Sequence, residues 1–344
     1  MKIRTCLAIL ATGSLLLSAC SSVGGAGGKT GGNAGSGASK NKTMVTVVKV
    51  KGIAWFDRMD EGVVEWGKEN GYDTRTEGGD DVSPEKQIQV IQDLIAQKPA
   101  AITVVPNSPE ALSAVLAQAK QQGIPVVSHE ATGIKNVDID IEAFDNVSYG
   151  ERIMKNIGQC TGGKGKYVQF VGGLTAKTHM EWVEAAYKYQ TKNFPGMQRV
   201  ETPIESTDNE TAAYEKAKEI LGKYPDIKAF QGSAGNDVPG IARAVEEAGL
   251  QDKVCVMGTS IPSASSKYLA NGSIDKIFFW DPALAGKAQL EIAKRLASGK
   301  TIKPGDDLGI EGYHSLKKLK GYDNVWVGDA AIEADAKAAK QFNF

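Results

Sequence analysis

The feature that most constrains the fold is a regular alternation of strand-like and helix-like segments, which begins at residue 44 and continues to residue 298. Strands that alternate with helices predict βαβ units and parallel sheets. The alternation occurs in two series, separated by a stretch near residues 137–150 that we interpret as a crossover. We therefore predict an α/β protein with two similar lobes, each built on a parallel sheet.

The first series is defined by short apolar runs and by helix-start patterns. Strands are predicted at 44–49, 101–105 and 124–128, and a helix at 62–70. Ser83-Pro84-Glu85 predicts a further helix start, because Ser caps a helix, Pro suits its first turn and Glu suits its positive end. Ser108-Pro109-Glu110 repeats this pattern before another helix, which Gly123 ends.

The second series follows the crossover. Its predicted helices cover 151–157, 181–191, 211–223, 240–248 and 283–298, and its predicted strands cover 167–171, 199–204, 229–231, 254–257 and 274–279. We expect the last helix to return to the first lobe. The first lobe is therefore predicted to comprise 44–135 and 283–315, the second lobe 142–278, and the final segment 316–344 a further crossover and a tail.

The N-terminus predicts export. Lys2 and Arg4 precede an apolar stretch that ends in Leu17-Ser18-Ala19-Cys20, which is typical of a secretory signal peptide. The ending resembles the lipobox of bacterial lipoproteins, which implies that Cys20 carries a lipid; the alternative is ordinary cleavage near Ala19. Residues 21–43 are rich in Gly, Ser and Ala and predict a flexible tether. We expect an exported domain anchored to a membrane by its lipid.

Composition and charge exclude several classes of protein. With 344 residues, 42% of them hydrophobic, the chain can form two cores, and its formal net charge of −1 argues against a nucleic-acid partner. Its three histidines lie far apart, and we predict no metal and no cofactor. Beyond the signal peptide and Cys20, two cysteines remain, Cys160 and Cys255. They form one disulfide or are two buried thiols, and neither has metal-ligand spacing.

The carboxyl ends of the first-lobe strands carry candidate ligand-binding residues, because ligands bind at this edge of open parallel sheets. Trp55 and Phe56 are adjacent aromatics that can stack on the apolar face of a sugar, or serve as core and lid. Glu130 can accept hydrogen bonds from hydroxyl groups, or be a surface acid. A catalytic pair of His129 and Glu130 is disfavoured, because adjacent residues on an extended chain point to opposite faces.

The second lobe offers similar candidates after its strands. Small and polar side chains follow the strand at 167–171, and an Asn-Asp pair and a Trp-Asp pair follow two later strands. The alternative for each segment is a turn and helix cap alone. The candidates in this part of the chain are Thr178, His179, Gly235, Asn236, Asp237, Trp280 and Asp281. Asn107 is a further polar candidate, from the first lobe.

Five segments, in this order, resemble the type I solute-binding proteins of ABC importers, and among them most closely the rhamnose-binding and autoinducer-2-binding proteins. The segments are VVKVKGIAWFDRMDEGVVEWGKENG, AAITVVPNSPEAL, GIPVVSHEA, GNDVPGIARAVEEAG and VMGTSIPSASSKYLANGSIDKIFFWDPALAGK. The resemblance implies two Rossmann-like lobes with parallel sheets, joined by three crossovers, which close on a sugar or a related polyol. It also implies a membrane permease and a separate ATPase as partners, and we expect the binding protein to be a monomer.

The resemblance assigns roles to particular positions. Lys49 matches a lysine that autoinducer-2 binders place on ligand oxygens, and Trp55 and Phe56 match the stacking pair of the family. Glu130 stands where the family usually has Asp, and Thr178-His179 stand where autoinducer-2 binders have Asp and Gln. Gly235, Trp280 and Asp281 match further contact positions. The substitutions at 130, 178 and 179 would repack a small pocket, so a neutral sugar and autoinducer-2 both stay open as ligands.

Two rival classes of protein are disfavoured by the sequence. Residues 158–164 match the start of a phosphate-binding loop, but Gly165 stands where Ser or Thr would hold magnesium, and the stretch follows a helix and precedes a strand. No Gly-x-Ser-x-Gly or His-Glu-x-x-His motif occurs. A transcription regulator would need an N-terminal helix-turn-helix, where this chain has its signal peptide. We therefore predict a binding protein and not an enzyme.

Overall fold

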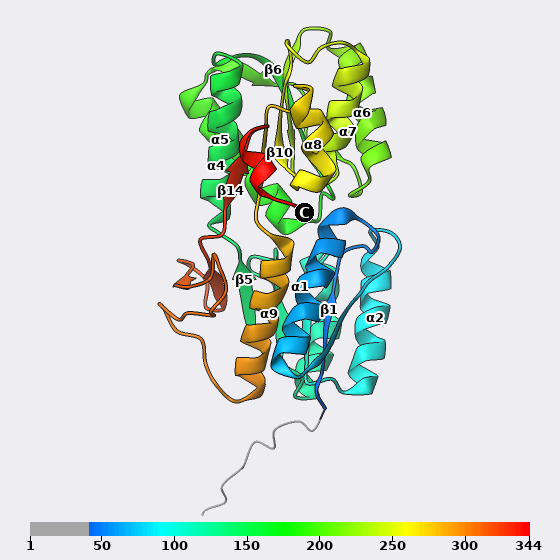
Figure 1. Cartoon of the computed structure of the whole chain (residues 1–344), viewed down its shortest axis with the longest axis vertical. Coiled ribbons are helices and arrows are strands. Elements are labelled where there is room, and N and C mark those ends of the chain that lie inside the picture. Colours follow the sequence, from blue (N-terminus) through cyan, green and yellow to red (C-terminus); the bar gives the residue numbers. More distant parts are fainter. Residues whose placement is uncertain (1–40) are drawn as a thin grey trace, which may run out of the picture. The chain divides into compact units, whose positions relative to one another are not determined.

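The structure is a computed structural model that describes residues 41–344 and contains two mostly parallel sheets, each covered by helices (Figure 1). The predicted signal peptide, the lipidation of Cys20 and nearly all of the predicted tether lie outside the described residues. Thr43, the last residue of that tether, already belongs to the first strand. None of the described helices is long and apolar enough to cross a membrane.

The first sheet has the order β12-β13-β5-β4-β3-β1-β2 and is parallel except for the pair β12–β13. Its strands are β1 (Thr43–Val47), β2 (Asp73–Glu77), β3 (Ala101–Val104), β4 (Val126–Ser128), β5 (Ile139–Glu142), β12 (Lys317–Lys318) and β13 (Val325–Val327). Its helices are α1 (Ala54–Asn70), α2 (Pro84–Gln97), α3 (Pro109–Gln121) and α9 (Pro282–Ala297). This sheet therefore takes strands from residues beyond the predicted range 44–135.

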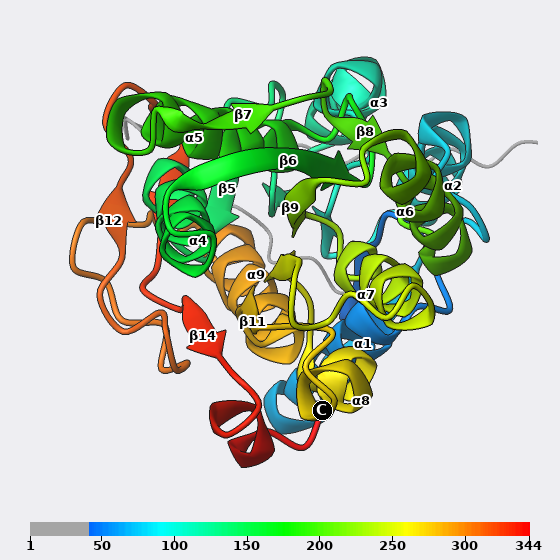
Figure 2. The same cartoon turned by 90° about the horizontal axis from the view of Figure 1, so that it is seen from above.

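The second sheet has the order β14-β11-β10-β9-β6-β7, with β8 beside β6. Its strands are β6 (Lys164–Val171), β7 (Gly196–Arg199), β8 (Ile204–Glu205), β9 (Ile227–Gly232), β10 (Cys255–Thr259), β11 (Lys276–Phe279) and the antiparallel β14 (Ile332–Ala334). Its helices are α4 (Asn146–Cys160), α5 (Lys177–Asn193), α6 (Glu210–Lys223), α7 (Asp237–Glu247), α8 (Pro262–Ala270) and the short η1 (Ala338–Gln341). Figure 2 shows α4 beside α5 and α6 beside α7 around this sheet.

Three connections join the two sheets: from β5 to α4, from β11 to α9 and from β13 to β14. Two of them are held together by backbone hydrogen bonds, since Gly328 N donates to Glu142 O and Ala330 N donates to Ala143 O. The predicted return of the last long helix is confirmed, because α9 packs on α1, β3, β4 and β5. Gly62 permits this approach, as a Cβ there would lie 2.2 Å from Ala283 O.

Several local predictions need correction. Helix α1 begins at Ala54, so Trp55 and Phe56 lie in its first turn and not in a loop after the strand. Ser83 caps α2 by accepting from Lys86 N, whereas Ser108 makes no such bond at the start of α3. The single strand predicted at 199–204 is the end of β7 followed by a turn and then β8, because Pro203 has no N–H for a central strand.

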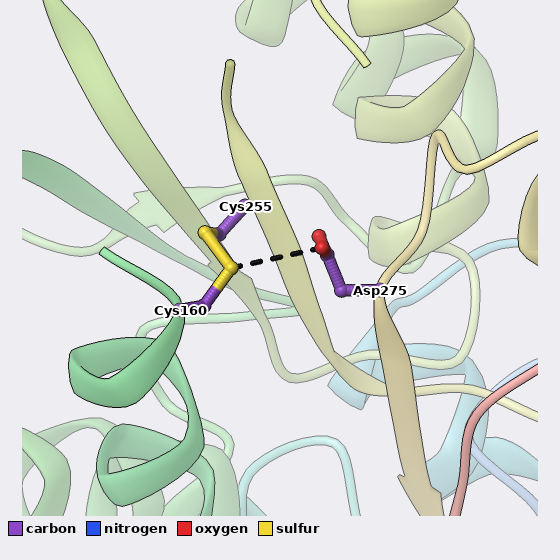
Figure 3. A group of neighbouring side chains, drawn as sticks. All are labelled: Cys160, Cys255 and Asp275. Atoms are coloured by element: carbon purple, nitrogen blue, oxygen red, sulfur yellow. Dashed lines mark hydrogen bonds between the residues drawn. A yellow bond between two sulfur atoms is a disulfide. The ribbon is translucent and has the colours of Figure 1, made fainter. Parts of the chain in front are cut away.

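The open question about the two cysteines is resolved by a disulfide between Cys160, the last residue of α4, and Cys255, the first residue of β10 (Figure 3). Their Cα atoms are 6.4 Å apart, within the range that a disulfide spans. The bond closes a loop across 95 residues of the second lobe. In the chain-entropy description, such a loop stabilises the fold by about 4–5 kcal/mol.

Candidate ligand-binding site

A cavity lies where the carboxyl ends of strands from both sheets meet. The space between protein atoms there is about 280 Å³, part of it open solvent, and the centre of a water molecule has room to move in only about 20 Å³ of it. The lining residues are Lys49, Ile53, Trp55, Phe56, Glu130, His179, Trp182, Asp208, Ser233, Gly235, Thr259 and Trp280. Trp55 and Trp280 meet edge to face with ring centroids 4.7 Å apart, so aromatic surface forms much of the wall.

Lys49 and Glu130 form a buried ion pair on the first-lobe side of the cavity. Lys49 Nζ donates to Glu130 Oε2 at 2.5 Å, and both side chains are almost fully buried. Burial alone would raise the pKa of Glu130 and lower that of Lys49. The attraction within the pair outweighs burial, so the pKa of Glu130 lies below its usual value and that of Lys49 above it. Both groups are therefore charged at neutral pH.

Glu130 also occupies an unusual backbone conformation. Its φ is 57°, in the left-handed region that costs free energy for a residue other than glycine. The conformation turns the chain at the end of β4, and the carboxylate lies at the cavity beside Lys49. Backbone strain of this kind is frequent at functional sites, so the observation supports a role for Glu130 beyond packing.

The hydrogen bonds of the two buried histidines fix their neutral tautomers. His179 Nδ1 accepts from Gly172 N at 3.1 Å, so Nε2 carries the hydrogen, 3.9 Å from Glu130 Oε2. Burial lowers the pKa of His179 to about 3. His129 Nδ1 lies 2.6 Å from Ile141 O and must donate to it, which leaves Nε2 unprotonated, 3.9 Å from Glu130 Oε1. The 3.9 Å between His129 Nε2 and Glu130 Oε1 is too long for a hydrogen bond, and the His129 ring is fixed by Ile141 O. Both observations agree with our rejection of a catalytic His129–Glu130 pair.

Asp208 is a second carboxylate at the cavity, and it comes from the second lobe between β8 and α6. Burial raises its pKa, which the positive charge of Lys49 partly offsets. Thr207 and Asp208 have φ values of 57° and 53°, so this loop is strained in the same way as Glu130. Within residues 41–344, no group donates a hydrogen bond to the Asp208 carboxylate. It is therefore a buried acceptor that a ligand can satisfy.

Seven of the predicted site residues line the cavity, namely Lys49, Trp55, Phe56, Glu130, His179, Gly235 and Trp280. Gly235 lies against the indole of Trp55, and a Cβ at this position would be 3.2 Å from Trp55 Cε3. In the first lobe, the structure brings together Lys49 after β1, Trp55 and Phe56 at the start of α1, and Glu130 after β4. Their contact with a ligand stays a prediction.

The other five predicted residues, Asn107, Thr178, Asn236, Asp237 and Asp281, lie beside the cavity without lining it. Asn107 Nδ2 donates to Lys49 O at 3.1 Å, and Asn236 Nδ2 donates to Asp208 O at 2.9 Å. Asp237 Oδ2 accepts from the backbone N–H groups of Ser233 and Ala234, and the hydroxyl of Thr178 is buried. We infer that several of these side chains position the lining residues.

Asp281 has a different environment from the one expected for a ligand-binding residue. Its carboxylate caps α9 by accepting from Ala283 N at 2.8 Å. It also accepts two hydrogen bonds from Arg58 of α1, at 2.9 and 2.7 Å. These contacts occupy both carboxylate oxygens, so Asp281 ties the β11–α9 connection to the first lobe.

Five lining residues were missed by the sequence: Ile53, Trp182, Asp208, Ser233 and Thr259. Ser233 follows β9 and Thr259 ends β10, so a search of the strand ends could have identified both residues. Trp182 was hidden because it lies within α5, where a buried aromatic normally indicates core. Trp182 Nε1 donates to Asn146 Oδ1 at 2.8 Å, which orients its indole toward the cavity wall.

The cavity combines apolar walls with a few polar groups that have unused hydrogen-bonding capacity. Ser233 Oγ and Trp280 Nε1 have no partner within the described residues, and the Asp208 carboxylate accepts no hydrogen bond. Small-molecule sites have this composition, since apolar surface supplies area and convergent polar groups supply orientation. The lining groups therefore suit contact with a small polar molecule that has an apolar face.

Comparison with known proteins agrees with this description. The D-xylose-binding periplasmic protein of Haemophilus influenzae is 26% identical over 254 residues, which cover 71% of this chain and 72% of the relative. The D-allose-binding periplasmic protein of Escherichia coli is 26% identical over 226 residues, which cover 63% of this chain and 72% of the relative. These relatives are binding proteins and not enzymes.

Solved structures match the fold over nearly the whole described chain. LsrB from Clostridium saccharobutylicum in complex with AI-2 has a TM-score of 0.80 at 19% identity and covers 88% of this chain and 100% of its own. A solute-binding protein from Clostridium phytofermentas with bound L-rhamnose has a TM-score of 0.80 at 22% identity and covers 88% of this chain and 99% of its own. The predicted type I fold is therefore confirmed.

The sequence profile described as the periplasmic binding protein domain matches residues 44–301. The match covers every lining residue of the cavity and reaches all strands of the two sheets except β12, β13 and β14. The chain, a solute-binding protein with its cavity between two α/β lobes, belongs to the periplasmic binding protein family.

Proposed function

We propose that this protein captures a small sugar or polyol in the cavity and delivers it to an ABC importer. The observation that carries the proposal is the cavity lining, in which Trp55, Phe56, Trp182 and Trp280 form apolar walls around Asp208 and Ser233. Aromatic rings stack on the C–H faces of sugars, and free carboxylate and hydroxyl groups bind sugar hydroxyls. The xylose-binding and allose-binding relatives support the same class of ligand.

The charges of the cavity favour a neutral ligand. Lys49 is balanced by Glu130 within its own lobe, and burial keeps both His179 in the lining and the nearby His129 neutral. An anionic solute would meet the carboxyl group of Asp208, and Lys49 is already paired with Glu130. A hydroxyl-rich neutral solute can instead donate to Asp208 and accept from His179 Nε2. The expected ligand is therefore a neutral monosaccharide or polyol.

The proposed mechanism is closure of two lobes around the solute. Ligand contacts from both lobes stabilise the closed state relative to the open state, and the closed protein then docks on a permease that a separate ATPase drives. The lobe boundaries, with 44–135 and 283–315 in the first lobe and 142–278 in the second, belong to this proposal. So do the monomeric state and the anchoring of the protein by a lipid on Cys20.

A ligand screen tests the proposal. The protein is heated in the presence of aldoses, deoxysugars, polyols and autoinducer-2, and its melting temperature is recorded. A ligand at a hundredfold excess over its Kd stabilises the folded state by about 2.7 kcal/mol. We expect one neutral sugar to raise the melting temperature and Trp55→Ala to lose this rise, whereas Tyr322→Ala, at an exposed aromatic outside the cavity, keeps it.

The outcome also separates the two candidate solutes. A rise with autoinducer-2 alone would replace the sugar with a signalling molecule, which Lys49 in the cavity favours. A rise that persists in Trp55→Ala would place the ligand outside this cavity. No rise with any compound would contradict the proposed function. Replacement of Cys20 by Ala, followed by fractionation of the cells, tests the anchor separately, and we expect release of the protein from the membrane fraction.

A further inference from the structure

A chain of buried hydrogen bonds spans the connection from β5 to α4 and reaches both walls of the ligand cavity. At its centre lies Asn146, the first residue of α4. Asn146 Oδ1 accepts from Trp182 Nε1 at 2.8 Å, and Asn146 Nδ2 donates to Thr132 Oγ1 at 3.0 Å. Thr132 Oγ1 in turn donates to Glu142 Oε1 at 3.0 Å. All four residues are buried, so the chain is shielded from solvent.

The two ends of this chain hold residues on opposite walls of the cavity. Trp182 lines the second-lobe wall and belongs to α5, which lies beside α4 (Figure 2). Glu142 Oε1 also accepts from Ala131 N at 2.9 Å, and Ala131 directly follows Glu130, which lines the first-lobe wall. Glu142 thus fixes the backbone next to the left-handed turn at Glu130. The chain therefore joins a strained turn of one lobe to an indole of the other.

Helix capping, the ordinary role of a polar side chain at a helix start, does not account for Asn146. Asp145 caps α4, since its Oδ1 accepts from Ser148 N at 2.8 Å. Asn146 Nδ2 makes a further hydrogen bond, to Glu181 Oε2 of α5 at 3.2 Å. The carbonyl oxygen and both amide hydrogens of Asn146 are therefore engaged by side chains outside its own helix.

We propose that Asn146 is a positioning residue for solute binding: it holds the indole of Trp182 against the cavity and couples it, through Thr132, to the opposite wall. The role in binding rests on the proposed function, whereas the coupling between the walls does not. Asparagine suits this position because it combines one acceptor with two donors. An ionised aspartate has the same shape but no donor, and leucine has neither.

The place of Asn146 in the chain relates the coupling to movement of the lobes. Only residues 143–145 separate Glu142, the last residue of β5, from Asn146. Rotation of the lobes about this connection changes the distance between Thr132 and Asn146, because the two residues belong to different lobes. In the present arrangement the hydroxyl of Thr132 keeps the amide in the orientation that accepts from Trp182.

Hydrogen exchange of the Trp182 Nε1–H tests the coupling without any solute. The indole signals of the full chain are followed by NMR, with Trp182→Phe for assignment and Trp66, near the end of α1, as internal reference. Thr132→Val removes the hydroxyl and keeps the shape of the side chain. We expect it to speed the exchange of Trp182 about tenfold, the effect of one lost buried hydrogen bond. Thr132→Ser keeps the hydroxyl and should exchange like the wild type.

A second pair of variants tests Asn146 itself. Asn146→Ala removes the direct acceptor of the Trp182 indole, so it should speed the exchange of this hydrogen more than Thr132→Val does. The matched control is Asn156→Ala in the same helix. Asn156 bonds to Arg152 O and to the ammonium group of Lys276, away from the chain, so its loss should leave the Trp182 signal unchanged.

The role in binding is tested by calorimetric titration with D-xylose, D-allose, D-ribose and L-rhamnose as probes. For a sugar that the wild type binds, we expect Thr132→Val to raise the Kd about tenfold and Thr132→Ser to leave it unchanged. Absence of binding of all four sugars to the wild type would count against the proposed function alone, because the exchange rates decide the coupling.

Three results would overturn the proposal. The first is an exchange rate of the Trp182 indole in Thr132→Val that equals the wild-type rate. The second is an equal acceleration at Trp66, which would indicate destabilisation of the whole protein. The third is an unchanged Kd in both Thr132→Val and Asn146→Ala for a sugar that the wild type binds. If Asn146→Ala fails to fold, the comparison of Thr132→Val with Thr132→Ser decides by itself.

Discussion

The two faces of the ligand cavity differ in how their polar groups are satisfied. The first-lobe face consists of Lys49, Ile53, Trp55, Phe56 and Glu130, and its charges pair with each other at 2.5 Å. The second-lobe face consists of His179, Trp182, Asp208, Ser233, Gly235 and Thr259. Its carboxylate accepts no hydrogen bond from residues 41–344, and the hydroxyl of Ser233 has no partner among them.

The pKa shifts of the carboxylates express the same difference. Glu130 on the first-lobe face has a lowered pKa, because Lys49 outweighs the effect of burial. Asp208 on the second-lobe face has a raised pKa, and burial raises that of Asp237 behind it to about 7. The first-lobe face is therefore complete without a ligand, whereas the second-lobe face depends on what enters the cavity. We expect mutations to affect stability on one face and affinity on the other.

The largest effect is expected from breaking the ion pair. Glu130→Gln leaves Lys49 buried and unpaired, which should lower the free energy of unfolding by about 3 kcal/mol. The double variant Lys49→Met, Glu130→Gln removes both charges and should recover most of this loss. Urea denaturation of the three proteins checks the prediction. A single variant as stable as the wild type would mean that the cavity is open to water.

The second prediction concerns the opposite face. Asp208→Asn replaces a buried carboxyl group that accepts no hydrogen bond from residues 41–344, so stability should be unchanged or slightly higher. Affinity for the sugar should fall about tenfold to a hundredfold, since hydrogen bonds to charged groups contribute about 1.5–3 kcal/mol. Calorimetric titration and thermal unfolding measure the two quantities. A loss of stability without a loss of affinity would reverse the assignment of the faces.

The third prediction uses the pH. The pKa of Asp237 is about 7 in the folded protein and near its ordinary value of 3.8 in the unfolded chain. The folded state therefore binds more protons between these values, and its stability falls as the pH rises from about 4 to about 7. Asp237→Asn keeps an acceptor for Ser233 N and Ala234 N but does not titrate.

The melting temperatures of wild type and Asp237→Asn are therefore compared between pH 4 and pH 8. We expect similar melting temperatures for the two proteins at pH 4 and a higher melting temperature for the variant at pH 8. The free energies of unfolding of the two proteins should differ in their slope against pH by on the order of 1 kcal/mol per pH unit. Asp252→Asn, at an exposed position of the same lobe, should show no such divergence. Parallel curves for wild type and Asp237→Asn would contradict the raised pKa.

The smallest effect is expected where the two faces touch. A Cβ on Gly235 would lie 3.2 Å from Trp55 Cε3, so Gly235→Ala requires the indole to move by a few tenths of an ångström. We expect a loss of about threefold in sugar affinity, because closure is slightly hindered. Gly222→Ala, which meets no atom within 4 Å, is the control. Unchanged affinity in Gly235→Ala would show that Trp55 adapts freely.

Much of the first-lobe face could be predicted because its residues stand next to strand ends in the sequence. Lys49 follows β1, Glu130 follows β4, and the aromatic pair lies close behind Lys49. Periodicity and helix-start patterns found these strands to within a few residues. They failed at the start of α1 because Ala54 has no capping side chain before it, as Ile53 occupies the N-cap without a side-chain bond.

The second-lobe face was harder to predict because its residues serve the cavity from unexpected places. Trp182 lies in the interior of α5, and Asp208 follows a strand of only two residues. Asp237 and Asp281 stand at the expected positions, yet they hold backbone amides and Arg58. An Asp that caps a turn and an Asp that faces a ligand have the same appearance in a sequence.

The sequence by itself determined the alternation of strands and helices, the two-lobed α/β class and the edge of each sheet where a ligand can bind. These follow from local hydrophobic periodicity, helix-start chemistry and the direction of parallel strands, all of which act over short distances along the chain. Only the tertiary structure decided which polar groups are satisfied by the protein and which are free. The Lys49–Glu130 pair, the unpartnered Asp208 and the Cys160–Cys255 disulfide depend on distances between segments that are remote in sequence.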